Sequence, residues 1–271
     1  MKKIDYNYVI ENIEDVIELI NGKYEEDETS VFKSYYRGQS NAEWLLTPKI
    51  ARQNSTLEPS ISTDEDIFTI LAQKQHYGEN TRLLDFTRDV KVALYFACSE
   101  KNNIEKDAKI FVYKYDNITE NSKYTKIACE FSQLTQATNV DNFSALISNK
   151  YDIALDDVKG IIFSILDCGF MVTPTNTFYE KMFGFNDRIR EQKGCFYIPA
   201  NQSNFTEIKR LPRLLSDSYK HVIIQPKCIS PIIYDISNNP TILIPYRLKS
   251  QILKLLLKDY NISAKTLGLE S

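Results

Sequence analysis

The sequence predicts an α+β fold in a single domain. Its candidate strands are short and alternate irregularly with helical segments, which fits an α+β protein better than a doubly wound parallel sheet. The chain has 271 residues, of which 43% are hydrophobic, so it contains enough apolar side chains for a sizeable core. No clean linker divides the chain, and we therefore expect one domain.

Helical patterns mark four segments of the chain. Apolar residues at helical spacing, with acids on the opposite face, predict a helix over residues 5–21. A capping box begins at Thr63 and predicts a helix that Gly78 ends. Residues 90–99 and 246–260 are predicted as two further helices.

The predicted strands are short runs rich in β-branched and aromatic residues. The first covers residues 31–36 and stops at Gly38. Residues 117–160 are polar and helix-like with weak periodicity, so we expect an insertion or a helical layer there. The remaining strands are expected at residues 108–115, 160–166, 169–173, 195–198 and 221–225.

Composition excludes several classes of protein. The net charge is −3, with −6 in residues 1–30 and +3 in the rest. The overall charge therefore does not predict nonspecific electrostatic binding of nucleic acid. A local basic cleft is still compatible with this net charge. No apolar run approaches the roughly 18 residues of a membrane helix, and no apolar stretch follows the N-terminus as in a secretory signal. Five scattered cysteines predict reduced thiols in the cytoplasm, with neither a zinc site nor a disulfide framework. Residues 1–27 are expected to form an acidic helical segment.

The first candidate site is the segment Tyr35-Tyr36-Arg37-Gly38-Gln39-Ser40. An arginine next to a glycine at a strand end suits close approach of backbone to a ligand, and a guanidinium matches a pyrophosphate. The alternative is a strand-end arginine paired with a carboxylate.

The second candidate site runs from His76 to Thr87 between two predicted helices. His76 is one of two histidines and is either a general base or a residue that bonds the last carbonyls of a helix. Arg82 and Asp85 are three residues apart and would suit a structural ion pair, and Asp85 or Thr87 could cap the following helix. The neighbouring apolar residues are expected in the core: Leu83, Leu84, Ala93, Leu94 and Phe96.

The third candidate site is the polar turn of residues 186–194 that leads into a predicted strand. An acid and an amide, Glu191 and Gln192, lie where a turn residue can face a cleft. The alternative is a solvated run of charges. Standard signatures for phosphate loops, zinc proteases and serine hydrolases are missing from the sequence, and its carboxylates are too few in one place for a metal-dependent nuclease.

Together the three segments resemble the FRG domain of bacteria and phages. The resemblance rests on Y-R-G-Q with a following W-x-L-x-P, on Q-H-Y-G-x-x-T-R-L-L-D-F-T with A-L-Y-F-A, and on R-x-x-x-Q-x-G-x-F. It covers roughly residues 28–269 and includes the tail I-S-A-K-T-L-G-L, so the domain is expected to span residues 28–271.

The order of these segments is similar to ADP-ribosyltransferases of the arginine–serine–glutamate class. That resemblance implies a mixed, mostly antiparallel split sheet surrounded by helices, with NAD as substrate and no metal. It further implies a cytoplasmic toxin of a toxin–antitoxin or anti-phage system, with RNA or protein as acceptor, an antitoxin as possible partner and no membrane association.

The resemblance also assigns roles to residues. Arg37 would hold the NAD pyrophosphate or ribose, Thr87 would support the nicotinamide pocket, and Tyr36 or Tyr95 would stack on nicotinamide. Further cofactor contacts would come from Gly38, Gln39 and Arg82.

The late motif departs from the family pattern. That class expects Glu-x-Glu or Gln-x-Glu, whereas this chain has Arg190-Glu191-Gln192-Lys193-Gly194. A glutamine neither stabilises an oxocarbenium-like state nor takes a proton well, so Asp85, or His76 as base, is expected to fill that role. The alternatives are an NAD glycohydrolase and a nucleotide-binding or phage-sensing module without catalysis.

Two substitutions follow from this interpretation. Gly38→Val is expected to abolish ligand binding by blocking close backbone approach, while leaving the fold largely intact. Phe96→Ala is expected to destabilise the protein by ~3–5 kcal/mol if the ring is fully buried.

Overall fold

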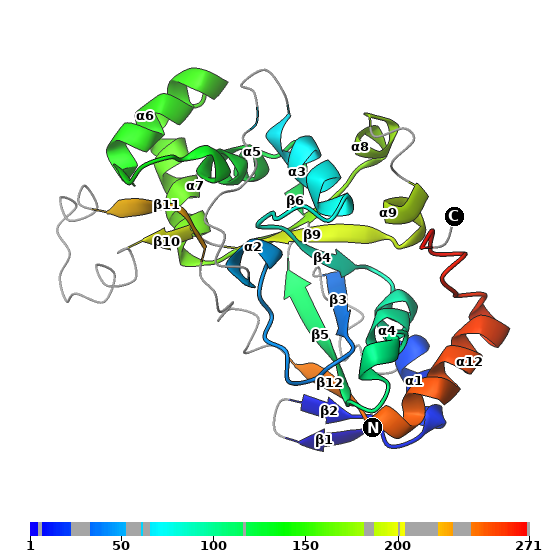
Figure 1. Ribbon diagram of the computed structural model, residues 1–271. Helices are drawn as coiled ribbons and strands as arrows, with labels where there is room; N and C mark the ends of the chain where they lie inside the picture. The colour runs from blue at the N-terminus through cyan, green and yellow to red at the C-terminus, as the bar shows by residue number, and fades with distance from the viewer. Residues whose placement is uncertain are drawn as a thin grey trace.

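The computed structural model shows helices grouped around a long central sheet (Figure 1). It describes residues 1–4, 7–22, 33–52, 61, 66–115, 118–181, 187–199, 201–203, 222–229 and 240–269.

The described strands form one nine-stranded sheet and one three-stranded sheet. Most neighbours are antiparallel, and the parallel pairs are β2 with β12 and β6 with β8, so the predicted mixed, mostly antiparallel sheet is confirmed. The large sheet has the order β1 (Lys2–Ile4), β2 (Asn7–Val9), β12 (Thr241–Ile244), β5 (Ala108–Tyr115), β3 (Lys33–Gln39), β4 (Leu84–Thr87), β9 (Gly194–Ile198), β8 (Phe170–Thr173) and β6 (Ile118–Thr119). The small sheet has the order β10 (Asn201–Ser203), β11 (Ile223–Ile229) and β7 (Thr138–Asn139).

The two halves of the large sheet meet at a narrow junction between β3 and β4. Strand β3 pairs with β5 along its whole length, from Lys33 opposite Tyr115 to Gln39 opposite Lys109. It pairs with β4 through a single position, Tyr36 opposite Thr87. Beyond that position the two strands are not paired, so their backbones are free to diverge.

One group of helices packs on the β3 side of this junction. Helix α4 (Val90–Cys98) lies along β3, and α1 (Ile13–Ile20) and α12 (Lys249–Tyr260) pack against α4 (Figure 1). These helices and strands β3, β5 and β12 enclose one apolar cluster, which includes Val16, Ile110 and Ile252.

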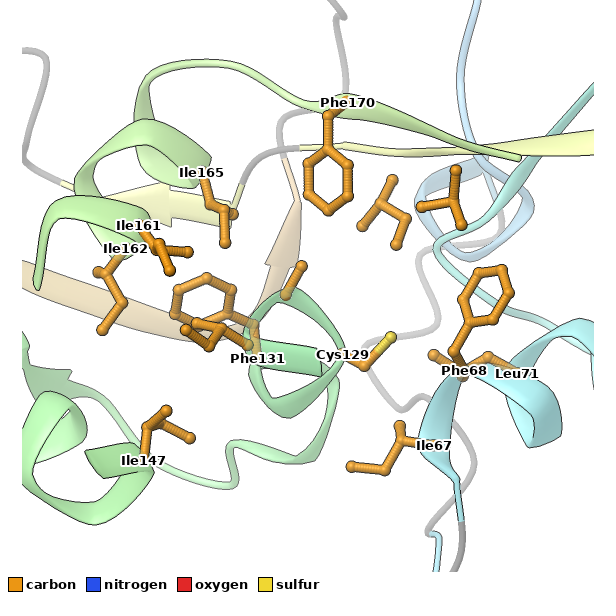
Figure 2. Close-up of a cluster of buried hydrophobic side chains, with 14 of the residues drawn as sticks. Ile67, Phe68, Leu71, Cys129, Phe131, Ile147, Ile161, Ile162, Ile165 and Phe170 are labelled. Atoms are coloured by element: carbon orange, nitrogen blue, oxygen red, sulfur yellow. The ribbon is translucent and has the colours of Figure 1, made fainter. Parts of the chain in front are cut away.

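A second group of helices packs on the β9 side and encloses the largest apolar cluster (Figure 2). There Phe131 stacks on Phe143 with ring centroids 4.8 Å apart, and Phe68 lies 5.6 Å from Phe178 and 5.7 Å from Phe196. The helices are α3 (Ile67–His76), α5 (Lys123–Glu130), α6 (Val140–Tyr151) and α7 (Leu155–Asp167). The described part of the predicted segment, residues 118–160, therefore contributes mainly a helical layer of the core.

The other described helices are short. They are α2 (Lys49–Arg52), α8 (Asn176–Lys181), α9 (Asp187–Glu191) and three 3-10 turns, Lys101–Asn103, Phe131–Gln133 and Tyr246–Leu248. No helix of the described segments is long and apolar enough to span a membrane.

The predicted helix over residues 5–21 is wrong in its first half. Helix α1 begins at Ile13, where Asn12 caps it by accepting a hydrogen bond from the Asp15 amide at 3.0 Å. Upstream, β1 and β2 form a hairpin, and β2 pairs with β12, more than 230 residues away. A distant strand partner overrides the local helical spacing.

The predicted strand over residues 160–166 is also wrong, because this segment belongs to α7. The buried residues Ile161, Ile162, Ile165 and Leu166 lie on one side of a helix at that spacing. A run of β-branched residues was therefore misleading about its backbone.

Most other predicted elements are confirmed. Strand β5 has the predicted bounds, and α3, α4, β8, β9 and α12 lie close to theirs. Two details differ: Gly38 lies inside β3 instead of ending it, and Asp66 is the N-cap of α3. Thr63, His221 and residues 31–32 lie outside the described residues.

Candidate functional site

A cavity of about 290 Å³ lies at the junction of β3 and β4. Its lining includes Tyr36, Arg37 and Gly38 from β3 and Asp85, Phe86 and Thr87 from β4. Helices α3 and α4 and the segment from Arg188 to Phe196 supply the walls. Residues from all three predicted segments therefore meet around one hollow, close in size to the smaller ligand pockets of proteins.

The register of the sheet explains how these side chains meet. Tyr36 is opposite Thr87, and Asp85 is opposite Phe196. Opposite residues, and residues two apart along a strand, share a face, so all four project from the same side. Phe68 of α3 packs on Phe196, which places α3 on that side too.

Arg37 bridges the two halves of the sheet just beyond their last paired position. Its Nη1 donates a hydrogen bond to the backbone carbonyl of Asp85 at 2.5 Å. Because β3 and β4 are no longer paired there, this hydrogen bond links the two strands where the backbone ladder does not. The partly buried Arg37 thus lines the cavity with its position fixed by backbone.

Gly38 is required by helix packing. A Cβ at this position would lie 2.8 Å from the backbone nitrogen of Ala97 and closer still to the carbonyl oxygen of Ala93. Both atoms belong to the backbone of α4, which cannot move aside easily. The expected effect of Gly38→Val is therefore wrong for the fold: the substitution would displace α4 before it affected a ligand.

Thr87 and Gln192 are joined by a hydrogen bond across the cavity wall. The Thr87 hydroxyl donates to the Gln192 carbonyl at 2.6 Å and accepts from the Asp89 amide at 3.0 Å. Asp89, not Thr87 or Asp85, is the N-cap of α4. The Gln192 side-chain amide donates to the carbonyl of Leu267 at 2.9 Å.

His76 and Asp85 face the cavity from α3 and β4. Burial and the positive charge of Arg188 lower the pKa of His76 below its ordinary 6.5, and Asp85 acts in the opposite direction. The Asp85 carboxylate accepts a hydrogen bond from Gln75 Nε2 at 3.0 Å. The site therefore offers an imidazole biased toward its neutral form and an exposed carboxylate anchored at one oxygen.

Four predicted site residues do not line the cavity. Arg82 is 1% exposed and donates to Asn201 Oδ1 at 2.5 Å, so the expected Arg82–Asp85 ion pair is not formed. Gln39 is buried one residue past the lining. Tyr95 packs on the apolar cluster under α4, and Glu191 is exposed on α9.

Phe96 differs from the other four apolar residues expected in the core. Leu83, Leu84, Ala93 and Leu94 are each no more than 1% exposed. Phe96 is partly exposed and lines the cavity instead.

The polar or aromatic lining residues that were not predicted as site residues include Gln75, Phe96, Glu100 and Arg188. Val92, Phe96 and Glu100 are spaced by four, which places them on one side of α4, and this spacing is visible in the sequence. Arg188 is the first residue of the R-x-x-x-Q motif, one helical turn before Gln192. Neither pattern identifies a site residue until the position of the cavity is known.

Glu100 is held by a hydrogen-bond network that extends from the cavity lining to the buried residue Lys249. Its carboxylate accepts a hydrogen bond from the Ser40 hydroxyl, which in turn accepts from Asn103 Nδ2 at 3.1 Å. The buried ammonium of Lys249 donates to the carbonyls of Ser40 and Asn103, each at 2.7 Å. Burial lowers the pKa of Lys249.

The charges around the cavity are balanced between two guanidinium groups, Arg37 and Arg188, and two carboxylates, Asp85 and Glu100. Within the described ranges no three acidic, histidine or cysteine side chains gather as metal ligands would. The arrangement suits an organic ligand with anionic groups, because guanidinium binds phosphate by paired hydrogen bonds.

Comparison with known proteins gives one result that bears on the site. The FRG domain family matches residues 54–106, which include α3, β4 and α4. No curated protein and no solved structure matches the chain. The match covers the segment that carries His76, Asp85, Thr87 and Phe96.

Proposed function

We propose that this protein is an NAD-consuming ADP-ribosyltransferase whose active site is the cavity at the β3–β4 junction. The observation that carries the proposal is the meeting of Arg37, His76, Asp85 and Thr87 around that single hollow. These residues come from segments far apart in the sequence. Together they supply a phosphate-binding cation, a base and a carboxylate, which are the groups such a reaction needs.

Arg37 is the proposed partner of the NAD pyrophosphate. Its Nη1 is held by the Asp85 carbonyl, so the guanidinium is already oriented before a ligand enters. A fixed donor loses little conformational entropy on binding. Tyr36 lines the cavity beside it and is the proposed aromatic contact, whereas Tyr95 lies outside.

Asp85 is the proposed carboxylate that stabilises the transition state of the reaction. When the bond between nicotinamide and ribose breaks, nicotinamide leaves with the electron pair and positive charge develops on the ribose. A carboxylate near that charge lowers the barrier. Neither Glu191, which is exposed outside the cavity, nor Gln192, whose amide donates to Leu267, supplies this charge.

His76 is the proposed base. The incoming nucleophile forms its bond to ribose C1′ and loses a proton, which a neutral imidazole can accept. The lowered pKa of His76 favours that neutral form near pH 7. Thr87 shapes the wall by holding the Gln192 carbonyl.

The biological role that we propose is a cytoplasmic toxin of a toxin–antitoxin or anti-phage system, with an RNA or protein acceptor. Residues 31–52 carry Lys33, Arg37, Lys49 and Arg52 against one acid, Glu43. A locally positive stretch of sequence that contains Arg37 suits an anionic acceptor such as RNA.

The decisive experiment measures nicotinamide release from NAD by the purified protein, with and without RNA, DNA or cell lysate. Asp85→Asn should reduce the rate strongly, because it removes the charge and keeps the shape. Glu191→Gln is the matched control and should leave the rate unchanged. Equal rates for the wild type and Asp85→Asn would refute the role of Asp85, and no release under any condition would refute the reaction.

The acceptor dependence of the same assay separates transfer from hydrolysis. Label from NAD that becomes attached to RNA or protein identifies a transferase. Nicotinamide release at the same rate without any acceptor identifies an NAD glycohydrolase, in which water is the nucleophile.

A non-catalytic nucleotide-binding module is the second candidate, and one observation favours it. The position where the transferase class has a glutamate is Gln192, and its amide is engaged with the backbone of Leu267. Expression in a bacterial host distinguishes the two functions. A toxin should arrest growth and become harmless as Arg37→Ala, whereas a binding module should be tolerated in both forms.

A further inference from the structure

The chain after α12 folds back to the edge of the cavity. It runs from the end of α12 to a position beside α9 (Figure 1). Residues 263–269, here called the C-terminal turn, hold themselves together by backbone hydrogen bonds, including Leu267 to Ser263 at 3.1 Å and Leu269 to Ala264 at 2.8 Å. Leu267 is 1% exposed, so the turn is anchored in the fold.

The C-terminal turn contacts two residues of the cavity wall. The carbonyl of Leu267 accepts the hydrogen bond from Gln192 Nε2. Gly268, at φ +66°, lies so close to Arg188 that a Cβ on the glycine would be 3.3 Å from both Cα and Cβ of Arg188. The stem of Arg188 therefore packs directly against the backbone of the turn.

The guanidinium of Arg188 is available for a ligand. It lines the cavity and is partly buried. Among the described residues, no carboxylate lies within 4 Å of it and no hydrogen bond from its guanidinium is formed. Its charge nevertheless reaches His76, whose pKa it lowers.

We propose that Arg188 binds a phosphate group of the ligand and that the C-terminal turn is the element that positions it. This inference rests on the proposed function, in which the ligand is a dinucleotide with two phosphates. Arg37 on β3 and Arg188 on α9, which both line the cavity, then provide two guanidinium groups for one pyrophosphate. Packing of Gly268 on the stem of Arg188 limits where the guanidinium can lie.

The first test compares two ligands that differ in phosphate. Calorimetry measures NAD and nicotinamide riboside, which lacks phosphate, binding to the wild type, Arg188→Gln and Arg190→Gln. A charge-assisted contact predicts that Arg188→Gln weakens NAD binding by roughly 10- to 100-fold and leaves the riboside unchanged. Arg190 is exposed on the same helix, lies over the Tyr179 ring and does not line the cavity, so Arg190→Gln should bind NAD normally.

The second test distinguishes an effect of the C-terminal turn on NAD binding from an effect on the stability of the protein. Gly268 and Gly22 both have positive φ, at +66° and +73°, but no atom lies within 4 Å of a Cβ on Gly22. Both glycine-to-valine variants carry backbone strain, and only Gly268→Val should weaken NAD binding. Equal affinities in two folded variants would overturn the role of the turn.

A third measurement covers the case in which Gly268→Val does not fold. The sequence has two histidines, so the imidazole resonances of His76 can be assigned by its substitution and followed through a pH titration. Saturation with NAD should raise the pKa of His76 in the wild type, because phosphate offsets the nearby positive charge. The same addition should change it little in Arg188→Gln, and an equal rise in both proteins would overturn the proposal.

Inorganic pyrophosphate distinguishes failure of this inference from failure of the proposed function. If the wild type binds pyrophosphate but not NAD, and Arg188→Gln abolishes pyrophosphate binding, the anion site at Arg188 is supported and NAD is rejected as its ligand. If the wild type binds NAD and Arg188→Gln binds it equally well, the anion site at Arg188 is rejected, while the proposed use of NAD is still supported.

Discussion

Lys193 and Asp89 form an ion pair that joins the turn after α9 to the start of α4. The ammonium of Lys193 lies 2.8 Å from Asp89 Oδ2, while Asp89 Oδ1 accepts a hydrogen bond from the Lys91 amide at 3.0 Å. One carboxylate thus caps α4 and holds the segment that carries Arg188 and Gln192. Since Lys193 has a positive φ of 47°, the pair also stabilises an uncommon backbone conformation.

Replacing Asp89 with asparagine should lower the free energy of unfolding by ~1–2 kcal/mol, since the ion pair with Lys193 is lost and the cap is partly kept. Burial acts to raise the pKa of Asp89, but hydrogen bonds from Lys193 and the Lys91 amide, with their charges, lower it below 3.8. The stabilisation is therefore present above pH 3.8 and is lost as the pH falls below it. Urea unfolding of both proteins across this range measures the effect, and parallel curves would contradict it.

Gly38→Ala should destabilise the protein by ~1–3 kcal/mol or more, because the added methyl group overlaps the backbone of α4. Gly160→Ala is a matched control inside α7, where a Cβ meets no atom within 4 Å. It should stabilise the protein by about 0.5–1 kcal/mol. Thermal unfolding of the two variants checks both signs, and a neutral Gly38→Ala would mean that α4 lies farther from β3.

Phe96→Ala should affect ligand binding more than stability. Its ring is partly exposed in the cavity, so its loss should cost less than the ~3–5 kcal/mol typical of a fully buried phenylalanine. Phe68, which is 2% exposed and packs on Phe178 and Phe196, is the comparison that should show the full loss. Chemical denaturation gives the two stabilities, and NAD calorimetry on Phe96→Ala gives the binding effect.

The lowered pKa of His76 predicts a pH effect on stability. Burial and Arg188 lower this pKa and Asp85 raises it, and the net result lies below 6.5. The unfolded chain binds more protons between the lowered value and 6.5, so stability should decrease as the pH falls through that interval. His76→Gln should remove this part of the pH dependence in urea unfolding, whereas the same dependence in both proteins would assign it to another group.

The sequence was most informative where local pattern and burial agree. Strand β5 and helix α4 have strong local preferences, and both were predicted close to their observed bounds. The hairpin of β1 and β2 was missed because its pairing with β12 depends on residues far along the chain. A short apolar segment at helical spacing carries no signal of such a partner.

The sequence predicted which segments form the candidate site, but it did not predict how their side chains are arranged in space. The motifs around Arg37 and His76 indicated which segments matter, and the cavity lies where they meet. The packing role of Gly38 and the burial of Arg82 depend on atoms of α4 and Asn201 that sequence spacing does not locate. The role of Arg188 depends on its place in the cavity lining, which spacing along the chain does not give.

The position of β12 has a consequence for synthesis of the protein. This strand, Thr241–Ile244, lies between β2 and β5. Strands β2 and β5 therefore lack their shared partner until residues 241–244 have left the ribosome. Helix α12, which packs on α4, and the C-terminal turn emerge later still. A nascent chain therefore lacks part of the scaffold around the cavity until β12, α12 and the C-terminal turn have been synthesised.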